Sequence, residues 1–158
     1  MHARRRSPGS ASSPGVASRA QRVRTIRLRV DGVESIAALA AESAAADALW
    51  NALPLRTELF SAIWSGHACT FSPPPALLAA ADDAVGADNA VPVGTIAVAS
   101  RENGGVVVIA YGPTLHHTAL GPAPVTRFAE ITSGAPQFLA RIERIFTEGA
   151  VPLEIERA

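Results

Sequence analysis

Apolar and polar residues alternate along much of the chain from position 22 onward. The range 23–30 alternates arginine with valine, isoleucine and leucine, as a half-buried strand does. Asp31-Gly32 is a tight-turn signal, and 33–40 can return as the second arm of a hairpin. The same patterns predict further strands at 55–64, 67–71, 95–100, 105–112, 125–132 and 151–157.

Two ranges carry apolar residues at helical spacing instead. In 42–53 the stripe includes Leu49 and Trp50, and Pro54 ends the run. The range 133–149 is predicted to begin with a Ser133 cap and to end at Gly149. Its apolar stripe consists of Phe138, Leu139, Ile142, Ile145 and Phe146. The connection 72–94 begins with a run of three prolines and holds a short apolar helix-like patch and several acids. It is expected to cover a barrel mouth or form a lid.

Many strands with only two helices predict a mainly β fold, a closed β-barrel capped by helices. We place this single domain at 22–158, after a basic tail at 1–21 made of Arg, Ser, Pro, Gly and Ala. The tail is interpreted as disordered or as a mis-assigned start. A contact to nucleic acid or anionic membrane and a targeting peptide are the alternatives.

Charge and composition exclude several chemistries. Eight of the 14 arginines and none of the 14 acids precede Asp31, so the body is acidic and is predicted not to bind nucleic acid. The chain has no lysine, which excludes a Schiff base, a lysine general base and a P-loop lysine. Its one cysteine, Cys69, excludes an intrachain disulfide and favours a reducing, cytoplasmic location. No apolar run is long enough for a membrane helix, and no phosphate or dinucleotide loop is present, so neither membrane nor cofactor is expected.

Histidines provide the first candidates for chemistry. His67 and Cys69 are two residues apart in a predicted strand, so their Cα atoms lie roughly 6.5–7 Å apart. This distance disfavours a direct contact between a cysteine nucleophile and a histidine base. The favoured interpretation is that Cys69 is a buried core residue and that His67 lies at a turn. His116 and His117 are adjacent and lack a third ligand at a suitable spacing, so no metal site is predicted. His116 is either a ligand-facing acid or base or part of a bland polar loop.

Arg127 and Glu130 are the second candidates. In a regular strand Arg127 and Ala129 share one face, while Phe128 and Glu130 share the other. One charged side chain is therefore expected to face the barrel side or an end, where it would suit an anionic or amide substrate. A structural Arg–Glu pair is the competing interpretation.

Two aromatic residues are expected near the barrel mouth. Tyr111 ends the predicted strand 105–112 just before Gly112-Pro113. Its hydroxyl can donate to a ligand, or its ring can plug the barrel end. Trp64 stands beside the turn at Ser65-Gly66.

Several short motifs carry a resemblance over about 24–156: "ALWNALP" (48–54), "WSG" (64–66), "VPVGTIAV" (91–98), "IAYG" (109–112) and "RFAEI" (127–131). In these the chain resembles a small uncharacterised bacterial family of cyclophilin-like barrels. The resemblance implies the fold more than an activity, because the "FHR"-type strand and the glutamine–alanine-rich groove of prolyl isomerases are not found. Related barrels also occur beside urea- and amide-metabolising enzymes, which implies small amide-like ligands.

Two classes of function remain open. The first is a cofactor-independent barrel that binds or transforms a small polar molecule, amide- or carboxylate-like; the second is a non-catalytic, homo-oligomeric interaction module. Prolyl isomerase activity is a third, weaker option. The candidate ligand-binding residues are Trp64, His67, Tyr111, His116, Arg127 and Glu130, and Arg127, His116 and His67 are the catalytic candidates among them. A concave pocket with converging polar groups would favour the first class, and a filled barrel with a flat apolar patch the second.

Overall fold

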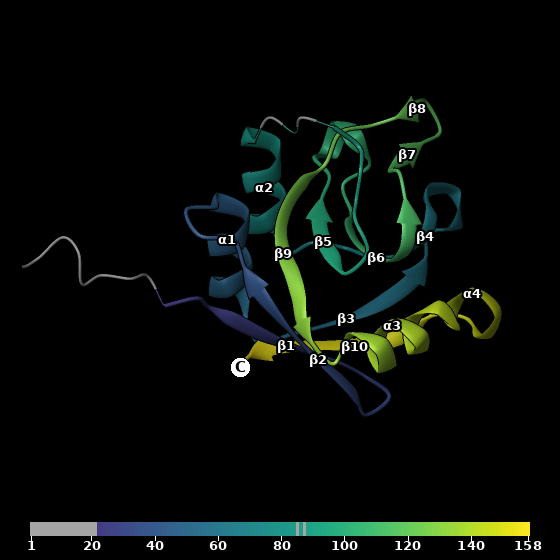
Figure 1. Ribbon diagram of the computed structural model, residues 1–158. Helices are drawn as coiled ribbons and strands as arrows, with labels where there is room; N and C mark the ends of the chain where they lie inside the picture. The colour runs from purple at the N-terminus through teal and green to yellow at the C-terminus, as the bar shows by residue number, and fades with distance from the viewer. Residues whose placement is uncertain (1–21, 85, 87) are drawn as a thin grey trace, which may run out of the picture.

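Eight strands form the body of the computed structural model, which describes residues 22–84, 86 and 88–158. They are β1 (Thr25–Val30), β2 (Val33–Leu39), β3 (Leu55–Ser61), β4 (Gly66–Phe71), β5 (Thr95–Val98), β6 (Val107–Thr114), β9 (Thr126–Ser133) and β10 (Val151–Arg157). All neighbouring pairs are antiparallel, and the sheet closes in the order β1-β10-β3-β4-β6-β5-β9-β2 (Figure 1). The predicted closed β-barrel is therefore confirmed, whereas the predicted tail at 1–21 lies outside the described residues.

Strands form in all the predicted ranges, but the one predicted at 55–64 ends at Ser61, and a 3-10 turn, Ile63–Ser65, follows it. β1 and β2 pair as a hairpin around Asp31 and Gly32, whose φ angles of 48° and 75° are those of a tight turn. Because β1 also pairs with β10, it is not an edge strand, and its arginines lie on the outer face of a closed sheet. The remaining short strands, β7 (His117–Thr118) and β8 (Gly121–Pro122), form a separate two-stranded ribbon.

Both predicted helices are present, with differences in detail. In α1 (Ala44–Ala52) the Ser43 side chain accepts a hydrogen bond from the Ala46 amide at 3.1 Å, as an N-cap does. The C-terminal helix is divided into α3 (Ala135–Glu143) and α4 (Ile145–Glu148). Its N-cap is Gly134, with a φ of 74°, so the predicted Ser133 cap is wrong by one residue.

A further helix, α2 (Pro75–Asp83), lies in the connection that was predicted to cover the barrel mouth. Proline suits its first turn because the missing amide has no helical partner there. Leu77 and Ala81 are buried four residues apart, and α2 packs against α1. Figure 1 shows α1 and α2 together at one side of the barrel, and α3 and α4 at another.

The barrel interior is filled with side chains. One buried core runs from the barrel to the helices packed on it, and its largest fully buried members are Phe71, Phe128, Phe138, Ile26, Leu28, Leu49, Leu59, Leu77, Ile96, Ile109, Ile142 and Ile145. A second buried cluster covers the outer faces of β4, β5 and β6, and includes Ala97, Val108 and Ala110. Ligand access therefore has to be sought on the outer surface. No helix within 22–84, 86 and 88–158 is long and apolar enough to span a membrane.

Candidate functional site

A β-bulge in β9 determines where its charged residues point. Opposite β5, Ile96 pairs with Ala129 and Ala97 pairs with Arg127, so Phe128 is the extra residue. Phe128 and Ala129 are consequently both buried in the interior, and both Arg127 and Glu130 are exposed. One charge was predicted to face the barrel side or an end; instead both are exposed, because the bulge breaks the alternation on which that prediction rested.

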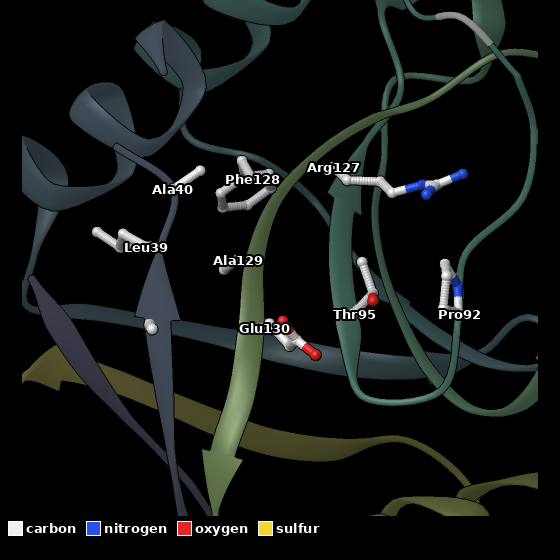
Figure 2. Close-up of a pocket in the computed structure, with 9 residues that line it drawn as sticks. Leu39, Ala40, Pro92, Thr95, Arg127, Phe128, Ala129 and Glu130 are labelled. Atoms are coloured by element: carbon white, nitrogen blue, oxygen red, sulfur yellow. The ribbon is translucent and has the colours of Figure 1, made fainter. Parts of the chain in front are cut away.

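The two charged residues line one open groove of about 470 Å³ on the outer surface. Its other lining residues are Ala38, Leu39, Ala40, Pro92, Thr95, Phe128 and Ala129. In Figure 2, Arg127 and Glu130 extend from β9 toward the segment that carries Pro92, with Thr95 of β5 between them, and Leu39 and Ala40 lie on the far side of β9. The groove thus combines an apolar side with three polar side chains.

The Arg127 guanidinium is fixed by two neighbours from the segment before β5. Its Nε donates to the Ala90 carbonyl at 3.0 Å, and its Nη2 donates to Asp88 Oδ1 at 2.9 Å. The Ala90 amide also donates to Asp88 Oδ1, at 3.0 Å. The Ala90 amide and then Arg127 hold the pKa of Asp88 below its ordinary value. Because a guanidinium has five N–H donors, Arg127 is oriented yet keeps donors for a ligand.

Glu130 and Thr95 stand directly opposite each other on β9 and β5. Among the described residues the Glu130 carboxylate has no ion pair. Thr95 is largely buried, with 8% of its surface exposed, and lies among the residues that line the groove. The sequence reasoning missed Thr95, since nothing in its local pattern shows that β5 pairs with β9.

The His67 and Tyr111 candidates come together at a second place. Their rings stack with centroids 5.8 Å apart and planes inclined by 19°. His67 is exposed on β4 and Tyr111 is half-buried on β6. Neither residue lines the groove of Arg127 and Glu130.

The remaining candidates line neither place. His116 is buried, and its Nε2 lies 2.7 Å from the Asn103 carbonyl oxygen. This contact connects the loop of His116 to the turn between β5 and β6, so His116 does not face a ligand. Trp64 is 59% exposed in the short 3-10 turn η1 (Ile63–Ser65). The turn is held to the segment between β6 and β7, because the Ser65 carbonyl accepts a hydrogen bond from the Leu115 amide at 2.9 Å.

Cys69 is placed as a core residue rather than a nucleophile. It is fully buried, and its Sγ donates to the Ile142 carbonyl at 3.3 Å. Burial raises the pKa of the thiol to about 12, so it stays protonated at neutral pH. In the described part of the chain, no three His, Cys, Asp or Glu side chains are grouped so that they could hold a metal ion.

Comparison with known proteins adds evidence on the fold. No family model and no curated protein sequence matches the chain. Among solved structures it is similar to the "Structure of McbB in complex with tryptophan", at 16% identity and a TM-score of 0.65 over 84% of this chain and 44% of that one. It is also similar to the hypothetical protein AF2241 from Archaeoglobus fulgidus, at 17% identity and a TM-score of 0.53 over 86% of this chain and 95% of that one. The chain spans less than half the length of the McbB chain. At these identities the similarity to both structures is one of fold alone.

Proposed function

We propose that the groove between β9 and β5 binds a small molecule that combines an acceptor oxygen with an N–H donor, namely an amide or a free amino acid. One observation carries the proposal: the bulge at Phe128 brings Arg127 and Glu130 to the same outer face beside Thr95. The guanidinium donates to the ligand's oxygen, and the carboxylate accepts from its N–H or ammonium.

The local charge favours an amide or a zwitterion over a simple carboxylate among the ligand classes that the sequence suggested. Arg127 contributes one positive charge, whereas Asp88 and Glu130 contribute two negative ones. A ligand whose only charge is a carboxylate would add to this excess of negative charge, and it is therefore disfavoured as the ligand of the groove. A neutral amide adds none, and a zwitterion places its ammonium beside Glu130.

The apolar side of the groove supports a ligand with an apolar body. Leu39, Ala40 and Phe128 line it. A small-molecule site of this size is commonly an apolar surface with a few polar groups that fix orientation. Tryptophan, which the similar McbB structure contains, has this combination and is the first amino acid to test.

The test is a calorimetric titration of the full chain with three indole compounds. L-tryptophan and neutral N-acetyl-L-tryptophanamide are expected to bind, and indole-3-propionate, a carboxylate without an N–H donor at that end, is expected to bind at least about tenfold more weakly. Glu130→Gln should weaken L-tryptophan binding by roughly tenfold or more, because its ammonium loses a charged acceptor.

The matched control is Glu58→Gln, which removes an exposed carboxylate from β3, away from the groove. It should bind L-tryptophan as the wild type does. Binding of indole-3-propionate as tight as that of L-tryptophan, or equal binding by Glu130→Gln and wild type, would refute the proposal.

A second candidate function is self-association. The filled barrel and the exposed apolar side chains of Ile63, Trp64 and Leu115, exposed by 52%, 59% and 51%, favour it. Sedimentation velocity that finds a monomer at micromolar concentration would rule it out. Membership of the cyclophilin-like family, a bacterial cytoplasmic location and prolyl isomerase activity stay proposals, and a proline-peptide assay tests the last.

A further inference from the structure

A second pocket, of about 340 Å³, lies where β4 and β6 meet the C-terminal helices. Its lining residues are Ile63, Gly66, His67, Tyr111, Glu143 and Phe146. None of them lines the groove of Arg127 and Glu130, so this pocket is a separate place on the molecule.

The stacked His67 and Tyr111 rings form one side of the pocket, and a glycine allows this arrangement. A Cβ atom at Gly112 would lie 2.6 Å from His67 Nδ1 and 2.7 Å from its Cβ. Only a residue without a side chain at position 112 therefore lets the imidazole lie close over β6 beside Tyr111. The close approach of β4 and β6 at Gly112 therefore sets the position of the His67 ring beside Tyr111.

The opposite side combines a carboxylate with exposed apolar groups. Glu143 is exposed at the end of α3 and has no ion pair in the described part of the chain. It is the one acidic or arginine side chain among the lining residues. Phe146 and Ile63 are 55% and 52% exposed, although side chains of this size are usually well buried.

The Glu143 carboxylate also acts on the Tyr111 phenol. Burial raises the pKa of the Tyr111 phenol, and interactions with Cys69 and Glu143 raise it further. The phenol therefore stays protonated at neutral pH and adds no negative charge to that of Glu143.

We propose that this pocket binds a small organic cation with an apolar body, an alkyl- or arylammonium. The ring faces of Tyr111 and Phe146 attract a cation, and the Glu143 carboxylate beside them anchors an ammonium through a charge-assisted hydrogen bond. Phe146 and Ile63 bury the apolar body of the same ligand. An anion would meet Glu143 and be repelled, and a neutral compound would lose both the ring and the carboxylate attraction.

The experiment compares three compounds of nearly equal shape: benzylammonium, benzyl alcohol and benzoate. Each is titrated into the full-length chain by ¹H–¹⁵N NMR. Benzylammonium is expected to shift the amides of Ile63, His67, Tyr111 and Phe146 and to bind roughly tenfold more tightly than the other two compounds.

Variants then separate this site from the groove. Glu143→Gln and Phe146→Ala, both at exposed positions, should each weaken benzylammonium binding, by roughly tenfold for Glu143→Gln. Glu130→Gln and Glu58→Gln should leave it unchanged, with thermal melts to verify that every variant is folded. Equal affinity of Glu143→Gln and wild type, benzyl alcohol binding as tightly as benzylammonium, or a loss of affinity in Glu130→Gln would each overturn the proposal.

Discussion

The outer face formed by β1, β2 and β10 and the outer face of β9 both carry charged residues, but they use them differently. On β1, Arg27 and Arg29 form ion pairs with Glu34, Glu154 and Glu156 at 2.7–3.6 Å. On β9, Glu130 has no ion pair among the described residues, and Arg127 is held by a loop carboxylate beside an open groove.

Strand register explains the difference. Arg27 stands opposite Glu156, and Arg29 opposite Glu154 and Glu34, so each charge meets its counter-charge across the sheet. Glu130 stands opposite Thr95 and Ala38, neither of which is charged. The charged residues of β1, β2 and β10 are thus paired with one another on the surface of the barrel. Glu130 is left unpaired beside the groove and is available to a ligand.

The largest effect is expected where the bulge meets the core. Phe128 is 1% exposed inside the barrel, and Phe128→Ala should lower the free energy of unfolding by about 3–5 kcal/mol, because a large cavity forms. Denaturant unfolding measures this change. A loss below about 1 kcal/mol would mean that Phe128 does not anchor the bulge in the interior.

An intermediate effect is expected at Asp88, through its pKa. Its lowered pKa stabilises the folded state above the ordinary value of 3.8, and this contribution is lost as the pH falls below 3.8 toward the folded-state value. Arg127→Gln should raise the pKa part of the way, since the Ala90 amide, the larger cause, remains. An NMR titration of the Asp88 carboxyl measures it, and an unchanged pKa would contradict the pairing of Arg127 with Asp88.

The smallest effect is expected on the paired face. Arg27→Gln removes one half-exposed member of a network in which Arg29 remains, so the denaturation midpoint should stay close to that of the wild type. L-tryptophan affinity should not change. A clear loss of affinity in Arg27→Gln would break the distinction between the two faces.

Local pattern was enough to predict most of the barrel. The hairpin at 23–40 and the strands beginning at Thr95, Val107 and Val151 follow from alternation and turn residues alone. α2 was recognised only as an apolar patch, because its nine residues pack on α1 rather than forming a long amphipathic stripe. Burial of Cys69 agrees with the interpretation that the sequence favoured.

The candidate sites were predictable only in part. Arg127, Glu130, His67 and Tyr111 were identified by residue type, but their grouping depends on contacts between distant segments. The bulge at Phe128 arises from pairing with β5, about thirty residues earlier, and local alternation cannot show it. Glu143 reaches the second pocket because of how α3 packs against β4 and β6, which no local pattern encodes.

The most direct test of the groove is an NMR map of L-tryptophan binding to the full chain. We predict amide shifts that cluster at 38–40, 95 and 127–130 and that largely disappear in Glu130→Gln. Shifts on the outer face of β1 and β10, or a map that is the same in Glu130→Gln, would contradict the claim that the unpaired carboxylate of β9 marks the binding site.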